Sequence, residues 1–118
     1  MASGRRCGTF DLTMTTNSAQ QLIYRAAMLV EEENFEEALA LLGDAIELST
    51  TARRLVELIQ ARSLRGEILL NAEREDEAAE EFKAVLGLSE ADDVDSAEVQ
   101  EEVATARHWL EELSHPEN

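Results

Sequence analysis

Apart from carboxylates, few of the side chains that commonly perform chemistry occur in this 118-residue sequence. It contains 26 Asp and Glu, two His and one Cys. Cys7 stands alone, and neither His108 nor His115 has a second His or Cys at ligand spacing. We find no pairing of a nucleophile with a base and no Gly-rich phosphate loop. Neighbouring carboxylates occur by chance in so acidic a chain, so they do not indicate a catalytic pair. For these reasons together, we expect neither an enzyme nor a cofactor.

The acidic segment from Glu90 to Asp95 comes closest to the pattern of a metal site. A calcium loop of the EF-hand type needs a Gly at its sharp turn and a closing Glu, and the segment has neither at the required spacing. His108 falls opposite the apolar arc of the last predicted helix, which indicates a surface position. We therefore expect no bound metal.

The net charge of −16 argues against nucleic-acid binding, which depends on clustered Lys and Arg. Nine of the ten basic residues are Arg, and only Lys83 is Lys. The excess acid has two interpretations: a surface that keeps the chain soluble in a high-salt cell interior, or an attraction for a basic partner. Most acids fall at turns and outer faces of the predicted helices. This distribution favours the first interpretation and suggests a salt-adapted source.

The sequence shows neither a secretory pattern nor an unbroken apolar run of about 18 residues, so we expect no membrane association. A single Cys allows no internal disulfide. These features are typical of a cytoplasmic protein. The length corresponds to one domain with its own core.

Apolar residues recur at steps of three and four from Ser18 almost to the end, which predicts an all-α fold. Residues 1–17 lack this periodicity and are interpreted as a flexible tail, so that residues 18–114 form a single domain. Ser18 with Gln21 has capping-box spacing, and Thr50 with Thr51 can cap the third helix. The predicted helices span about 18–31, 35–49, 51–72, 76–88 and 96–113.

A helix–turn–helix unit occurs twice along the chain. Shifting the sequence by 40 residues aligns Glu33 with Glu73 and Ala38 with Ala78, and large apolar positions also correspond. The pattern is typical of paired antiparallel helices repeated in tandem.

At these positions the chain resembles the tetratricopeptide repeat family. That family has a small residue in its first helix, an aromatic residue at the turn, and a small–large–small series in its second helix. The corresponding residues are Ala26, Phe35, Ala38, Leu42 and Ala45 in the first unit, and Gly66, Glu75, Ala78, Phe82 and Val85 in the second. The resemblance implies repeat units at about 19–49 and 59–89, with residues 96–113 as a capping helix. The result would be a short α-α superhelix of about five helices.

Four features depart from the family pattern, and one of them is that Leu22 and Arg62 replace its opening Trp. The period is 40 residues instead of about 34, which we interpret as an elongated third helix. Glu75 replaces the turn aromatic, and no Pro ends either second helix. A plain bundle of four or five helices is the structural alternative.

The resemblance implies that the first helices of the repeats line a concave surface that holds a peptide or helix of a partner protein. The family's groove positions correspond to Gln20, Ile23, Ala27, Val30, Glu31, Gln60, Ser63, Glu67, Leu70 and Asn71. This groove would be mixed apolar and polar, without Lys or Arg. Ile23, Ala27 and Leu64 occupy three places of the clamp that binds the C-terminal carboxylate of heat-shock chaperones, so that activity is not expected.

Two functions follow from this surface. The first is a non-enzymatic adaptor that binds a partner segment in the groove. The alternative is a structural module whose exposed face pairs with a second copy of the chain, because short arrays must cover their apolar faces. Trp109 borders the apolar arc of the last helix, which favours an anchor at the edge of the core over an interface hot spot.

Overall fold

The computed structural model describes residues 8–91, 94–95 and 97–114, with side chains from Ala19 onward. Within these ranges there are five helices and no strand, which confirms the all-α prediction. The helices are α1 (Gly8–Glu31), α2 (Phe35–Ala52), α3 (Leu55–Asn71), α4 (Glu75–Ser89) and α5 (Gln100–Leu113).

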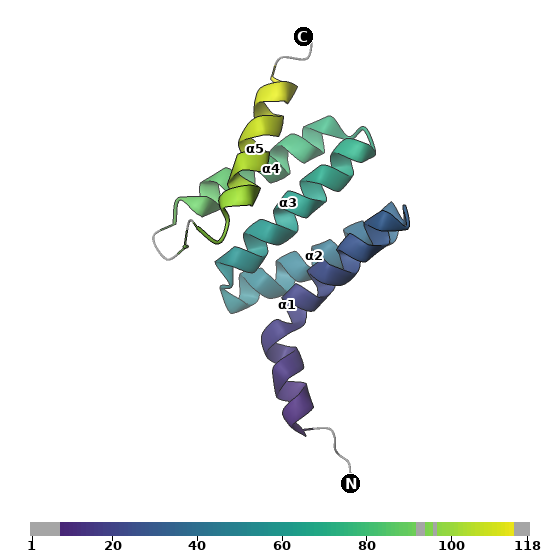
Figure 1. Cartoon of the computed structure of the whole chain (residues 1–118), viewed down its shortest axis with the longest axis vertical. Coiled ribbons are helices and arrows are strands. Elements are labelled where there is room, and N and C mark those ends of the chain that lie inside the picture. Colours follow the sequence, from purple (N-terminus) through teal and green to yellow (C-terminus); the bar gives the residue numbers. More distant parts are fainter. Residues whose placement is uncertain (1–7, 92–93, 96, 115–118) are drawn as a thin grey trace.

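The helices pack as two antiparallel hairpins and one further helix (Figure 1). The most extensive contacts join α1 to α2 and α3 to α4, while α2–α3 and α4–α5 contacts connect successive units. Both α1 and α5 also contact α3. Helix α3 is therefore the central element, and α1 and α5 lie on either side of it.

Two clusters of buried side chains form the core. One consists of Ala26, Ala38, Leu42, Ala45, Ala61 and Ile68, and joins α1, α2 and α3. The other consists of Ile59, Leu69, Ala78, Phe82, Val85, Val99 and Ala106, and joins α3, α4 and the C-terminal segment. The small residues let the helix axes approach closely while the large ones fill the remaining space. All five repeat positions of the first predicted unit belong to the first cluster or pack against it. In the second unit, Ala78, Phe82 and Val85 belong to the second cluster, and Gly66 packs against Phe82.

The turns that follow α1, α2 and α3 repeat every 20 residues. Glu33, Arg53 and Glu73 have φ angles of 61°, 58° and 63°, in the left-handed region that ends many helices. After each of them, the next N–H bonds back to a carbonyl five residues earlier, as the Arg54 N–H does to the Ser49 carbonyl at 2.9 Å. Each 40-residue repeat therefore consists of two units of 20 residues, and each unit is a helix followed by the same kind of turn.

This turn geometry corrects the prediction of an elongated third helix beginning at Thr50 and Thr51. The chain continues in α2 through Ala52, turns at Arg53, and enters α3 at Leu55. Helices α2 and α3 have 18 and 17 residues, so the 40-residue period does not come from one elongated helix. It comes from helices of similar length, each followed by a turn. Thr50 does not cap a helix, since its hydroxyl donates to the Ile46 carbonyl at 2.7 Å within α2. Neither Gly nor Pro marks the turn in the sequence.

The ends of the first and last helices also differ from expectation. Helix α1 begins at Gly8, ten residues before the predicted start at Ser18. Figure 1 shows its first turns projecting beyond the other helices. Residues 1–7 of the predicted tail lie outside the described residues. Helix α5 begins at Gln100 instead of 96, after a short turn in which Asp95 accepts a hydrogen bond from the Ala97 N–H.

The contact between α3 and α4 combines close packing with a buried ionic bridge. Gly66 faces Phe82 so closely that a Cβ atom added to it would lie 2.8 Å from the ring. Beside it, Glu81 is only 5% exposed and pairs with both Arg62, at 2.9 Å, and Arg65. These contacts hold α4 against α3.

Candidate functional site

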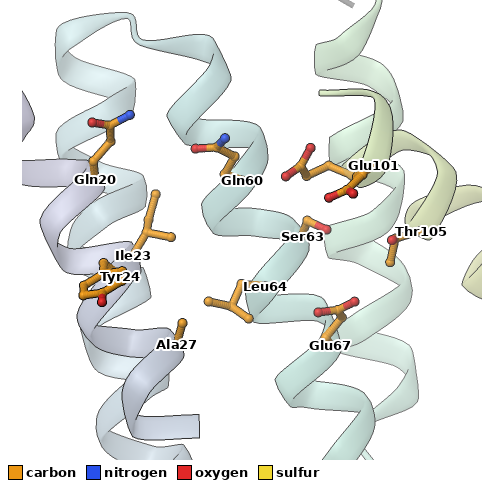
Figure 2. Close-up of a pocket in the computed structure, with 11 residues that line it drawn as sticks. Gln20, Ile23, Tyr24, Ala27, Gln60, Ser63, Leu64, Glu67, Glu101 and Thr105 are labelled. Atoms are coloured by element: carbon orange, nitrogen blue, oxygen red, sulfur yellow. The ribbon is translucent and has the colours of Figure 1, made fainter. Parts of the chain in front are cut away.

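An open groove lies between α1, α3 and α5, with a volume of about 590 Å³. Figure 2 shows side chains from these helices converging on it. The lining residues are Gln20, Ile23, Tyr24 and Ala27 of α1, Gln60, Ser63, Leu64 and Glu67 of α3, and Glu101, Glu102 and Thr105 of α5. We call this feature the α1–α3–α5 groove.

The α1 side of the groove is mainly apolar. Ile23 and Leu64 are half-buried and pack against the first core cluster, so they form a fixed floor. Ala27 is exposed, and Tyr24 is 69% exposed. An exposed aromatic ring beside small and branched apolar side chains is a surface on which a partner's apolar side chain can bury itself.

The α5 side of the groove is acidic. Glu101 and Glu102 lie in the first turn of α5, and Figure 2 shows Glu67 on the side of α3 nearest α5. Partial burial raises the pKa of the Glu67 carboxyl above its ordinary value, and the nearby negative charge of Glu102 raises it further. Glu102 is thus close enough to Glu67 to disfavour the charged form of the Glu67 carboxyl.

Neutral polar side chains from all three helices also line the groove. Gln20 and Gln60 carry amides that can donate and accept hydrogen bonds, and Thr105 adds a hydroxyl. Ser63 is only 6% exposed, yet it lies on the groove wall, where Figure 2 shows it on the side of α3 nearest α5. Such groups are suited to a peptide backbone, which presents donors and acceptors along its length.

The structure brings together six of the ten residues predicted for the groove. The six are Gln20, Ile23, Ala27, Gln60, Ser63 and Glu67. The other four lie at the C-terminal ends of α1 and α3, outside its lining. Val30 and Leu70 are half-buried and pack against the two core clusters, whereas Glu31 and Asn71 are exposed at the last residues of their helices.

Five lining residues were missed by sequence reasoning. Tyr24 and Leu64 adjoin predicted positions, and Leu64 had been considered only as a place of the carboxylate clamp. Glu101, Glu102 and Thr105 come from α5, whose sequence was interpreted only as a cap. The available signal was their spacing, since positions 101 and 105 lie on the same face of a helix. With these residues the groove is lined by three acids, Glu67, Glu101 and Glu102, whereas its predicted membership held two, Glu31 and Glu67.

A smaller depression lies on the outer side of α1, lined by Gln20, Gln21, Tyr24 and Arg25. Elsewhere, His108 is exposed and contacts Trp109 edge to face, with ring centroids 4.8 Å apart. Trp109 packs against the second core cluster, in agreement with its predicted place at the edge of the core. His115 and Cys7 lie outside the described residues.

Among the described residues, no group of three or more His, Cys, Asp or Glu is arranged to hold a metal ion. Over the same residues, none of the helices combines the length and apolar character that crossing a membrane requires.

Comparison with known proteins identifies no relative. No protein-family model matches the chain, and neither a curated protein nor a solved structure does so. The class of the protein is therefore defined by its own fold: an all-α chain of paired helices with a groove between the first, third and last.

Proposed function

We propose that this protein is a non-enzymatic interaction module that binds a segment of a partner protein in the α1–α3–α5 groove. The observation that carries the proposal is the groove itself, which is open, about 590 Å³ in volume, and lined by apolar, amide, hydroxyl and carboxylate groups from three helices. Sites for protein segments combine an apolar anchor with polar groups in this way. The lining residues include no Cys, His or Lys that could act with the carboxylates in catalysis.

The proposal includes a divergent tetratricopeptide-like architecture. Hairpins α1–α2 and α3–α4 would be the two repeats, and α5 would be the capping helix. The 20-residue spacing of the turns and the small residues at the hairpin contacts support it. In this arrangement α5 shields the last hairpin and also supplies one wall of the groove.

Blocking the groove without altering its charge tests the proposal. Ala27 is exposed and lines the groove, so Ala27→Trp should fill it while leaving the core intact. Ala40→Trp places the same side chain at an exposed position of α2 outside the groove and serves as the control. We expect proteins captured from the native extract by the wild type and by Ala40→Trp to be lost with Ala27→Trp. Equal capture by both variants would show that the groove does not bind the partner.

Self-association is a second candidate, favoured by exposed apolar side chains on α1. Tyr24 is 69% exposed, and Met28, one turn further along, is 49% exposed. A second copy could cover both, as short arrays cover their apolar faces. Light scattering at tens of micromolar distinguishes the two candidates, since self-association predicts a dimer mass that Tyr24→Ser with Met28→Ser reduces to that of the monomer.

We further infer a cytoplasmic location in a salt-adapted cell. The net charge of −16 and the single Lys support it.

A further inference from the structure

The α1–α3–α5 groove carries a negative charge that nothing in the described part of the chain neutralises. Glu67, Glu101 and Glu102 line it, and no Lys or Arg does. None of the ion pairs between described residues includes any of the three. The pKa of the Glu67 carboxyl is raised by burial and by Glu102, which is consistent with repulsion inside the groove. A positive charge placed there would relieve this repulsion.

A second feature of the groove is a buried polar group on its wall. Ser63 is only 6% exposed and faces the space between α3 and α5. A serine hydroxyl can donate and accept a hydrogen bond, so Ser63 adds a neutral polar group to the lining of the groove.

We propose that the occupant is a segment of a partner protein that presents Lys or Arg side chains to the α5 wall and apolar side chains to the α1 wall. Its cations would lie against Glu67, Glu101 and Glu102, and its apolar groups against Ile23, Tyr24 and Leu64. This inference rests on the proposed function and adds the chemistry of the partner to it.

Charge makes a second copy of the chain a poor occupant. Two copies, each with a net charge of −16, repel one another. Of the ten Lys and Arg, five already form ion pairs within the chain: Arg54, Arg62, Arg65, Arg74 and Lys83. A basic segment of another protein would bind at the acidic wall without this repulsion.

The test uses short random peptides displayed on phage and selected on the full chain at low salt. Selected peptides are then synthesised with a fluorophore, and their Kd is measured by anisotropy. Glu101→Gln with Glu102→Gln removes two charges from the groove. Glu111→Gln with Glu112→Gln removes two exposed charges near the other end of α5, outside the groove lining, and is the matched control. Circular dichroism and thermal melting verify that each variant is folded.

We expect the selected peptides to combine Lys or Arg with apolar residues. Neutralising Glu101 and Glu102 should weaken their binding about tenfold or more, because each charge pair contributes up to a few-fold in affinity. The control pair should change the Kd by less than about twofold, since exposed charges farther away are screened. Binding should also weaken as NaCl rises from about 0.05 M to about 0.5 M.

Two other results would overturn the inference, and they differ in what they leave standing. Neutral or acidic peptides that lose binding with Ala27→Trp but not with Glu101→Gln and Glu102→Gln would disprove a basic partner while supporting a groove that binds peptides. If no peptide is selected, or if binding survives Ala27→Trp, both this inference and the proposed function are wrong.

Discussion

Arg53 turns the chain between α2 and α3 in a conformation that suits glycine better than arginine. Its φ of 58° lies in the left-handed region, as do those of Glu33 and Glu73 at the equivalent turns. A side chain with a Cβ atom costs about 1–2 kcal/mol in this conformation relative to the right-handed one. These three turns form because the apolar faces on both sides of each turn are buried, and that burial outweighs the local strain.

Replacing Arg53 with Gly should therefore stabilise the protein. We expect Arg53→Gly to raise the free energy of unfolding by about 0.5–1 kcal/mol, after the greater freedom of glycine in the unfolded chain is included. Arg53→Ala removes the same side chain without relieving the backbone and is the control. Urea denaturation measures both. A glycine variant no more stable than the alanine variant would contradict the strain argument.

Glu67 is the residue whose ionisation should reduce stability. Its pKa is raised in the folded chain, by burial first and by Glu102 second. The folded state then holds the proton more tightly than the unfolded state, so stability falls as the pH rises from the ordinary pKa through the raised one. At neutral pH the charged group is destabilising, whereas below its ordinary pKa it has no such effect.

We accordingly expect Glu67→Gln to stabilise the chain at pH 7 by less than about 1 kcal/mol, because the side chain is more than a third exposed and water screens its charge. The gain should disappear when the pH falls below the ordinary pKa of a glutamate. Glu47→Gln, at an exposed position of α2, controls for the loss of one unit of negative charge. Thermal melts of the two variants across this pH range measure the difference. A gain independent of pH would exclude ionisation of Glu67 as its cause.

At the scale of the elements, the contact between α3 and α4 has least tolerance for added volume. Gly66 lies against the fully buried ring of Phe82, and the neighbouring bridge from Glu81 to two arginines leaves the helices little freedom to separate. A glycine inside a helix normally lowers stability, and here it is required because the two axes approach closely.

Gly66→Ala should lower the free energy of unfolding by about 1–3 kcal/mol, because the new methyl group would overlap the Phe82 ring. Gly87→Ala is the matched control, since a Cβ there meets nothing within 4 Å and should stabilise α4 by up to about 1 kcal/mol. Chemical denaturation of both variants tests the contrast. Adding Phe82→Leu should recover part of the loss caused by Gly66→Ala if the two residues are coupled. Equal effects of the two alanine substitutions would show that α3 and α4 can separate without cost.

At the scale of the whole molecule, charge repulsion extends across a thin fold. The chain carries −16 on a body of 63 × 35 × 19 Å. Its shortest dimension is about two Debye lengths at 0.1 M salt but less than one at about 0.01 M, so carboxylates on opposite faces repel one another only at low ionic strength. Folding brings these charges closer together than they are in the extended chain.

Added KCl should therefore raise the Tm, by several degrees between about 0.05 M and about 1 M, as the repulsion is screened. A variant with Glu32→Gln, Glu47→Gln and Glu111→Gln, all at exposed positions, should melt higher at low salt and gain less from KCl. Calorimetry of the two proteins measures this. A Tm that falls with KCl, or an equal rise in both proteins, would show that repulsion does not limit stability. Binding of a basic segment should respond to salt in the opposite direction.

The sequence by itself determined the features that depend on local spacing. Steps of three and four residues predicted the helices, and α4 (Glu75–Ser89) matches its predicted range of 76–88 within one residue at each end. The family resemblance, in turn, pointed to Gln20, Ile23 and Ala27, which are three and four residues apart and line the groove together from α1. Residues on one face of a helix are fixed relative to one another by helix geometry alone.

Only the tertiary structure decided where the chain turns after α2 and which charges the groove contains. No Gly or Pro marks the turn at Arg53, whose left-handed conformation is imposed by the burial of α2 and α3 on both sides of it. The wall formed by Glu101 and Glu102 depends on how α5 docks, and that is set by the burial of Val99 and Ala106 in a cluster with residues of α3 and α4. These contacts join residues far apart in the chain, so local spacing cannot predict them. The net charge can be calculated from the composition, whereas the gathering of Glu67, Glu101 and Glu102 at the groove depends on the fold.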